Sequence, residues 1–207
     1  MPNPGDAGQH YFSARPASGS AVRELKLHLP DLTLDLVVDR GVFSGDRVDP
    51  GTKLLLSEAP MPADLAGDVL DLGCGYGPIA VTVARRAASA TVWALDVNER
   101  ALALCETNAR TAGVGDRVRP VAEAHLPADV RFTAVYANPP IRIGKGPLQT
   151  LLTRWLGRMR PDATAWLVVH KHLGSDSLAG WLASQGYGVH RRTSRMGYRI
   201  LEVRPPA

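Results

Sequence analysis

Cysteine is scarce in this sequence: its 207 residues include only two, Cys74 and Cys105. Two cysteines cannot form the disulfide framework of a small secreted domain, and no Cys/His spacing suggests a zinc site. No apolar stretch approaches the ~20 residues that a membrane-spanning helix needs. The N-terminus lacks the basic and apolar segments of a secretory signal. These absences favour a protein of the reducing cytoplasm with no membrane partner.

The overall composition is that of an ordinary globular protein, with 45% hydrophobic and 21% charged residues. The net charge of +4 is unevenly distributed, because residues 138–207 contain eleven Lys or Arg and only three acidic residues. That half therefore carries +8 and residues 1–137 carry −4. A basic half favours a polyanionic partner such as RNA, although a solvated surface with a compositional Arg bias is the alternative. No obligatory protein partner is evident.

From residue 68 onward, apolar strands alternate regularly with amphipathic helices. Strands are predicted at 69–72, 91–95, 118–121, 132–137 and 165–169, helices at 78–88, 99–112, 148–159 and 177–184, and a closing strand pair at 188–193 and 198–203. Before them come strands at 22–29 and 32–38 and a short helix at 53–59. This pattern predicts an α/β fold: a doubly wound, mostly parallel seven-stranded sheet with a short N-terminal strand-rich extension. We expect a loose arm over residues 1–20 and one domain over 21–207, with the extension in 21–60 and the catalytic core in 66–207.

A glycine-rich segment, Asp71-Leu72-Gly73-Cys74-Gly75-Tyr76-Gly77-Pro78, follows the first strand of the alternating region. Glycines let the backbone turn tightly and approach a ligand without interference from a Cβ atom. At the C-terminal end of a central strand, such a loop lies where doubly wound sheets bind nucleotides. We therefore assign Asp71, Gly73, Cys74, Gly75 and Gly77 to a cofactor site.

Asp96 ends the next strand, about 20 residues after the loop, where a carboxylate can accept hydrogen bonds from both hydroxyls of a ribose. The G-x-G-x-G spacing differs from the G-x-G-x-x-G of dinucleotide sites, and Pro78 removes a backbone donor from the first helical turn. Asp71 would repel a pyrophosphate but suits a zwitterionic amino-acid moiety. The loop and Asp96 together favour S-adenosylmethionine over a nicotinamide dinucleotide.

A second motif, Asn138-Pro139-Pro140-Ile141, follows the strand predicted at 132–137. An aromatic amino group is a poor nucleophile because its lone pair is delocalised into the ring. If the Asn138 side-chain oxygen and the Pro139 carbonyl each accept one N–H, the lone pair is directed toward a methyl donor. The Pro-Pro segment holds that carbonyl in place because both φ angles are fixed. We assign these four residues to catalysis by positioning and electrostatics, with no metal required.

The sequence resembles class I S-adenosylmethionine-dependent methyltransferases with an Asn/Asp-Pro-Pro-aromatic motif, which methylate exocyclic or side-chain amino nitrogens. Within that group it is most similar to the small-domain family that contains bacterial 16S rRNA guanine-N2 methyltransferases and their single-domain archaeal relatives. The resemblance covers nearly the whole chain. It is carried by His10-Tyr11-Phe12-Ser13, Gly41-Val42-Phe43-Ser44, Asp49-Pro50-Gly51-Thr52, Asp71 to Gly77, Asn138-Pro139-Pro140-Ile141-Arg142 with Gly144-Lys145, and Gly197-Tyr198-Arg199.

The resemblance also implies further site residues. Val97, Ala122 and Glu123 correspond to positions at the adenine, and Asn138 also borders the cofactor. Ile141 departs from the family's aromatic residue at that position, so an aromatic face for the target base would come from Phe43 or Tyr198. Arg142 and Lys145 flank the target and suit contacts with RNA phosphates.

We therefore hypothesise an S-adenosylmethionine-dependent N-methyltransferase that acts on an exocyclic amino group of RNA, with guanine N2 of ribosomal RNA as the expected target. One alternative keeps the chemistry and changes the substrate to a protein glutamine amide or a small-molecule amine. A second alternative is a non-catalytic, cofactor-binding RNA scaffold or regulator.

Overall fold

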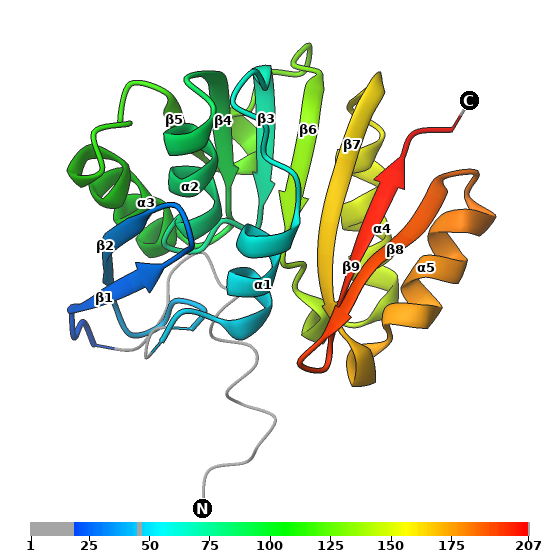
Figure 1. The fold of residues 1–207 in the computed structure, drawn as a ribbon, viewed down its shortest axis with the longest axis horizontal. Helices are drawn as coiled ribbons and strands as arrows, with labels where there is room; N and C mark the ends of the chain where they lie inside the picture. Colours follow the sequence, from blue (N-terminus) through cyan, green and yellow to red (C-terminus); the bar gives the residue numbers. More distant parts are fainter. Residues whose placement is uncertain (1–18, 45–46, 207) are drawn as a thin grey trace, which may run out of the picture.

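The computed structural model describes residues 19–44 and 47–206, shown as a ribbon in Figure 1. The strands are β1 (Arg23–His28), β2 (Thr33–Val38), β3 (Ala66–Leu72), β4 (Ser89–Leu95), β5 (Val118–Val121), β6 (Phe132–Ala137), β7 (Met159–His170), β8 (Gly188–Arg195) and β9 (Tyr198–Arg204). The helices are α1 (Pro50–Glu58), α2 (Pro78–Arg86), α3 (Glu99–Thr111), α4 (Lys145–Leu156) and α5 (Ser175–Ser184), with 3-10 turns η2 (Glu123–His125), η3 (Ile141–Ile143) and η4 (Lys171–Leu173). No described helix is long and apolar enough to span a membrane. The predicted arm and the segment His10–Ser13 lie, except for residues 19 and 20, outside the described residues.

The main sheet has seven strands in the order β5-β4-β3-β6-β7-β9-β8, which runs from left to right in Figure 1. The strands from β5 to β7 are parallel, and β9 is antiparallel to both of its neighbours. The predicted fold class is therefore confirmed. The chain winds one way from β3 to β5 and the other way from β6 onward, so the C-terminal ends of β3 and β6 frame the crevice where such sheets bind ligands.

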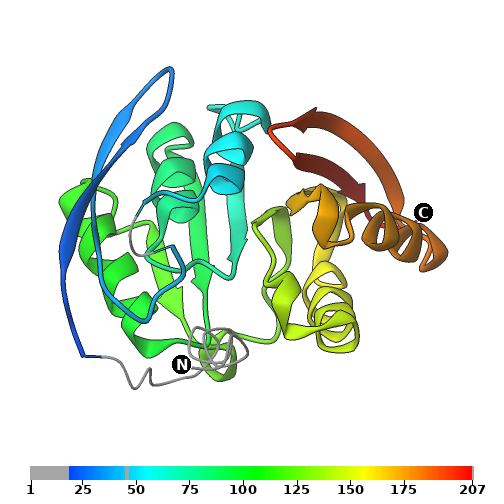
Figure 2. The same ribbon diagram turned by 90° about the horizontal axis from the view of Figure 1, so that it is seen from below.

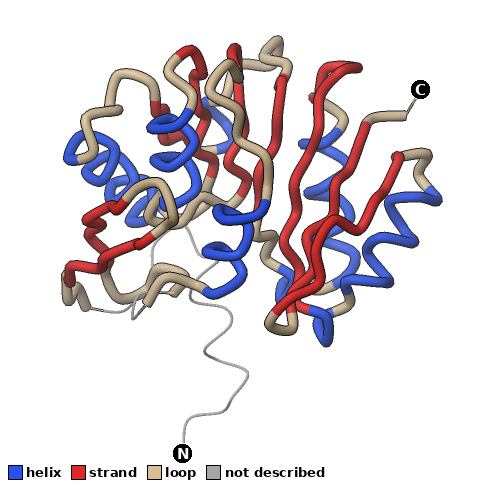
Figure 3. The backbone as a smooth tube through the Cα atoms, viewed as in Figure 1, coloured by secondary structure: helices blue, strands red, loops and turns tan. Residues whose placement is uncertain are grey.

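Helices cover both faces of the sheet (Figure 3), and alternate residues of each strand pack into one of two cores. Val69 of β3 belongs to the core formed with α1, α2 and α3, which also includes apolar residues of β1 and β2. Leu70 and Leu72 belong to the core formed with α4 and α5. Burial on both sides explains why the central strands are almost continuously apolar.

The N-terminal extension is a β1–β2 hairpin, paired antiparallel from Arg23 with Val38 to His28 with Thr33. Viewed from below, it runs along the outside of α3 (Figure 2). Buried Asn108 of α3 attaches it, accepting a hydrogen bond from the Val37 backbone N–H at 2.7 Å and donating to the Val37 carbonyl at 2.9 Å. The same amide donates to the Tyr76 carbonyl in the glycine loop at 2.8 Å. One side chain therefore joins three segments.

The structure corrects several predicted boundaries, most clearly those of α4 and β7. The helix predicted at 148–159 begins at Lys145 and ends at Leu156, because Pro147 falls in the first turn, where its missing N–H has no helical partner. Met159, expected in that helix, instead starts β7 opposite Phe132. Helix α1 begins at Pro50 rather than residue 53, because Asp49 caps it by accepting the Thr52 N–H at 2.9 Å.

Candidate active site

A cavity of about 760 Å³ lies at the C-terminal ends of β3, β4, β6 and β7. Loops from both halves of the chain contribute to its walls. It is lined by Val42, Phe43, Ser44, Asp49, Leu72, Gly73, Gly75, Leu95, Asp96, Val97, Asn98, Ala101, Glu123, Asn138, Pro139, Pro140, Ile141, Arg142, Ile143, Leu151, His170, His172, Leu173 and Tyr198. Both predicted motifs therefore face the same space, and the volume suits a nucleoside-sized ligand together with a target group.

The three loop glycines have positive φ angles but different surroundings. Gly73 and Gly75 line the cavity, and a Cβ atom on either would meet nothing within 4 Å. Gly77 does not line the cavity, since a Cβ there would lie 2.5 Å from the Sγ atom of Cys105 in α3. Cys74 is buried and also lies outside the lining. The structure thus places two of the glycines where a ligand can approach the backbone and gives Gly77 and Cys74 positions in the packing between the loop and α3.

The carboxylate of Asp96 lies beside the open glycines on the same wall of the cavity and helps to shape their loop. It accepts hydrogen bonds from the backbone N–H groups of Gly75 and Asn98, each at 2.9 Å. Burial raises the pKa of this carboxyl, while the backbone donors oppose the shift. Beside it, Val97 exposes 49% of its surface toward the cavity mouth. This pair presents a carboxylate next to an apolar surface, which is the combination that a ribose and an attached base require.

Asp71 is fully buried beneath the glycine loop and does not line the cavity. One carboxylate oxygen accepts the Ala80 N–H in the first turn of α2 at 2.9 Å, and the other has no hydrogen-bond partner in the described structure. Burial raises the pKa of Asp71 to about 8, with a smaller contribution from the nearby Asp96 charge. Asp71 thus holds α2 to the loop and keeps one oxygen available close to the cofactor side of the site.

The two residues expected at the adenine are separated in the structure. Glu123 lines the cavity from η2 and forms an ion pair with Arg154 of α4. Ala122 precedes it at the N-cap of η2 and is not part of the lining. Only Glu123 of this pair therefore presents a side chain to the site.

The side chain of Asn138 is oriented by groups that the sequence did not single out for this role. Its Nδ2 atom donates to Asp49 Oδ1 at 2.7 Å and to Thr52 Oγ1 at 3.0 Å. A carboxylate can only accept, so Asp49 fixes the NH₂ group on its own side and leaves the Asn138 oxygen for another donor. The sequence marks the Asp49–Thr52 segment only as part of the family resemblance, because its 89-residue separation from Asn138 hides the contact.

The Pro139-Pro140 segment forms a tight turn after β6. Pro140 has φ −75° and ψ 70°, and the Ile141 N–H donates to the Pro139 carbonyl at 2.8 Å. These values describe an inverse γ-turn. The turn fixes the Pro139 carbonyl with one acceptor position used and one remaining, so a substrate N–H can still be accepted there.

The opposite wall carries apolar and aromatic side chains. Phe43 and Leu173 are 48% and 45% exposed and, like Ile141, line the cavity. Tyr198 packs edge-to-face against His170, with ring centroids 4.8 Å apart. Its ring lies so close to α1 that a Cβ on Gly51 would approach Tyr198 to 2.6 Å, so glycine is required there. This wall can hold a planar aromatic group.

The predicted substrate residues are mostly brought together. Phe43, Arg142 and Tyr198 line the cavity, whereas Lys145 begins α4 just outside the lining. His170 and His172 also line it, although they are not among the predicted site residues. Their place at the end of a strand predicted in the parallel sheet was the available signal.

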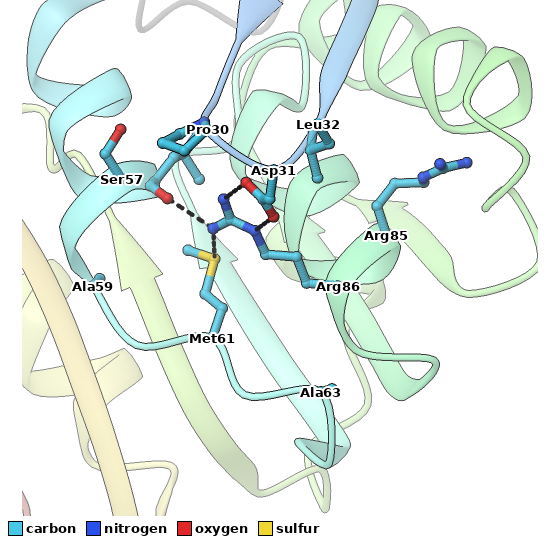
Figure 4. Close-up of a pocket in the computed structure, with 10 residues that line it drawn as sticks. Pro30, Asp31, Leu32, Ser57, Ala59, Met61, Ala63, Arg85 and Arg86 are labelled. Carbon is cyan, nitrogen blue, oxygen red and sulfur yellow. Dashed lines mark hydrogen bonds and ion pairs between the residues drawn. The ribbon is translucent and has the colours of Figure 1, made fainter.

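A second hollow, of about 610 Å³, lies between the hairpin turn, α1 and the end of α2 (Figure 4). Its central group, the Arg86 guanidinium, forms hydrogen bonds of 2.8 and 2.6 Å with Asp31 and donates to the Leu56 carbonyl at 2.7 Å. Because that charge is already paired, the hollow offers no reactive group. Arg86 instead ties the hairpin to both helices.

The residues of the main cavity fit an adenosyl amino-acid cofactor. Gly73 and Gly75 leave open space that a Cβ would fill, Asp96 supplies a carboxylate acceptor, and Asp71 retains an unpartnered buried oxygen nearby. Among the described residues, no cluster of three or more His, Cys, Asp or Glu side chains could hold a metal ion.

The strand order with its antiparallel β9, and a glycine loop facing the acidic end of the next strand, define a Rossmann-like methyltransferase fold. Residues 33–202 match the methyltransferase small domain family. The chain belongs to this family.

Two relatives and one solved structure show how the chain compares with known proteins. It is 30% identical over 200 residues to the uncharacterized protein YbxB of Bacillus subtilis, covering 95% of this chain and 98% of that one. It is 29% identical over 172 residues to ribosomal RNA small subunit methyltransferase C of Shewanella amazonensis, covering 81% of this chain but 49% of the relative. The 16S rRNA N2 G1207 methyltransferase of T. thermophilus, solved with AdoMet and guanosine, superimposes with a TM-score of 0.71 at 21% identity, covering 91% of this chain and 52% of that one. The chain therefore spans about half the length of these rRNA methyltransferases.

Proposed function

We propose that this protein is an S-adenosylmethionine-dependent N-methyltransferase acting on an exocyclic amino group of RNA, with guanine N2 of ribosomal RNA as the target. The observation that carries the proposal is the orientation of Asn138 by Asp49 and Thr52. The similarity to ribosomal RNA methyltransferases supports RNA as the substrate class.

In this proposal the cofactor occupies the wall formed by Gly73, Gly75 and Asp96. The Asp96 carboxylate accepts the ribose hydroxyls, and Val97 and Glu123 border the adenine. Asp71 holds α2 in register with the loop by accepting the Ala80 N–H from beneath the cofactor wall. When bound, S-adenosylmethionine supplies an electrophilic methyl group on a sulfonium.

The protein's own contribution is to position and polarise the amino group. Asn138 Oδ1 and the free acceptor position of the Pro139 carbonyl each take one N–H, which turns the nitrogen lone pair toward the methyl donor. Both acceptors are fixed before substrate arrives, one by Asp49 and the other by the γ-turn. Neutral oxygens at these positions also stabilise the positive charge that develops on nitrogen, without requiring a strong base.

The target base would lie between the apolar and aromatic groups of the opposite wall. Ile141 and Tyr198 replace the single aromatic contact expected from the family motif, and Phe43 closes the mouth. An exocyclic amino group inside a duplex cannot reach this depth, so the substrate nucleotide must be unpaired or flipped out.

The test is incubation of the purified protein with methyl-labelled S-adenosylmethionine and deproteinised total RNA from a strain that lacks the gene. We expect label in one rRNA species, recovered as N2-methylguanosine after digestion. Label on another RNA nucleoside would change the target, and label in a protein extract or a small-molecule amine would change the substrate class. Cofactor binding without transfer to any fraction would overturn the catalytic proposal.

A further inference from the structure

The basic residues of the C-terminal half fall into two groups that the sequence does not distinguish. Of the eleven Lys and Arg residues after position 137, seven form ion pairs with acidic side chains. An eighth, Arg158, donates to backbone carbonyls of Pro127 and Val130. Most of the basic residues in this part of the chain therefore have a partner within the protein.

The densest basic run of the sequence belongs to the paired group. Arg191 pairs with Asp176 at 2.8 Å, and Arg192 with Glu202 at 3.2 Å. Arg195 pairs with Glu58 of α1 at 2.9 Å. Each residue of this run therefore has a carboxylate partner, with Asp176 also paired with Arg199 and Glu202 also paired with Arg204.

Three cations remain without an ion-pair partner among the described residues: Arg142, Lys145 and Lys171. All three are exposed. They lie on two neighbouring connections, because Arg142 and Lys145 follow β6 while Lys171 follows β7, and β6 and β7 are adjacent parallel strands. Arg142 lines the cavity, and Lys171 stands between two histidines that line it.

We infer that Arg142, Lys145 and Lys171, here called the rim cations, form the surface that binds the RNA backbone and delivers the target nucleotide into the cavity. This inference rests on the proposed function, since it assumes an RNA substrate. Phosphates held by cations on two adjacent loops position the strand beside Ile141 and Asn138, while the base is recognised inside. The Arg191-Arg192-Arg195 run, despite its density, is not part of this surface.

Two variants that each remove three charges compare the rim cations with the Arg191-Arg192-Arg195 run. The rim variant carries Arg142→Gln, Lys145→Gln and Lys171→Gln, and the matched variant carries Arg191→Gln, Arg192→Gln and Arg195→Gln. The affinity of each for deproteinised 16S rRNA is measured by filter binding over a series of KCl concentrations. Calorimetric binding of S-adenosylmethionine to each variant checks that the fold and the cofactor wall are intact.

We expect the rim variant to lose at least about tenfold in affinity and to flatten the slope of log K against log[KCl] by about 2 to 3, since each lost phosphate contact removes about 0.7–0.9. The matched variant should stay close to the parent in both measures. Equal losses in the two variants, or a larger loss in the matched one, would overturn the assignment. The experiment measures RNA binding and not methyl transfer. If the rim variant binds RNA as well as the parent does, the rim assignment fails even when the parent methylates RNA. If the parent binds RNA but transfers no methyl group, the proposed function fails instead.

Discussion

The two walls of the cavity are held in place by different means. The cofactor wall consists of backbone and carboxylates locked by main-chain hydrogen bonds, as in the contacts of Asp96 with Gly75 and of Asp71 with Ala80. The target wall consists largely of side chains on exposed connections, such as Phe43 and Leu173. The two acceptors there, Asn138 fixed by Asp49 and the Pro139 carbonyl fixed by the γ-turn, are as firmly oriented. A rigid cofactor wall beside an adaptable target wall lets one fold keep its chemistry while its substrate changes.

The strongest test of this contrast is Asn138→Ala, which removes the oriented acceptor from the target wall. We expect kcat for methyl transfer to fall by about 100-fold or more, as for loss of a preorganised transition-state hydrogen bond. The affinity for S-adenosylmethionine, measured by calorimetry, should change little because the glycine loop and Asp96 are untouched. A variant with full activity would remove Asn138 from the mechanism.

The converse change is Asp96→Ala on the cofactor wall. Loss of hydrogen bonds to a charged acceptor costs about 1.5–3 kcal/mol, so the Kd for S-adenosylmethionine should rise about 10- to 100-fold. At saturating cofactor, kcat should be largely retained. Thermal unfolding of the ligand-free variant controls for the loop contacts that Asp96 also makes, and an unchanged Kd would contradict its role.

Asp49 connects Asn138 of the target wall to α1 and can be tested with a pair of variants. Asp49→Ala removes both the contact with Asn138 and the helix cap, whereas Asp49→Ser restores a cap but not a carboxylate. We expect kcat to fall about tenfold in both, because the Asn138 amide loses its fixed orientation. The alanine variant alone should lose about 1 kcal/mol of stability. Full kcat in the serine variant would show that capping is the only role of Asp49.

The glycine loop offers a matched comparison between Gly73→Ala and Gly77→Ala, since both positions have positive φ angles of 78° and 88°. At Gly77 the new Cβ meets Cys105, so we expect about 1–3 kcal/mol of destabilisation from overpacking in addition to the backbone strain. At Gly73 the Cβ enters the cavity, so cofactor affinity should fall with a smaller loss of stability. Chemical denaturation and calorimetry together check this, and equal destabilisation of the two variants would contradict it.

The last test concerns the pH dependence of stability and does not measure activity. The Asp71 pKa is raised to about 8 from the ordinary 3.8, so between these values the folded chain holds a proton that the unfolded chain has released. Its contribution to stability is therefore full at low pH and is lost as pH rises toward 8. Asp71→Asn cannot ionise and keeps an oxygen for Ala80. Over the range from pH 5 to pH 8 this proton linkage costs the parent about 3–4 kcal/mol. The melting temperature of Asp71→Asn should therefore rise relative to that of the parent by roughly 10 °C over this range, and parallel curves would exclude this coupling.

Sequence patterns predicted the sheet, the hairpin and both motifs because each depends on residues close together in the chain. The glycine loop and Asp96 belong to consecutive strand–helix units, and regular alternation alone places their ends at one edge of the sheet. Helix limits were less predictable, as at Met159, where pairing with Phe132 overrides helical spacing. The Asp49–Asn138 contact and the pairing of Arg195 with Glu58 depend on tertiary packing across 89 and 137 residues. No local pattern encodes such contacts.

The amide of Asn108 couples local opening of the β1–β2 hairpin to the glycine loop. It holds both backbone groups of Val37 and the carbonyl of Tyr76 at once. Separation of the hairpin at this point leaves the Asn108 amide with only the Tyr76 carbonyl as a partner, so one side chain couples the hairpin to the glycine loop. A ligand that steadies the loop lowers the frequency of such openings. Amide hydrogen exchange at Val37 should therefore slow when a ligand occupies the cavity, although Val37 does not line it.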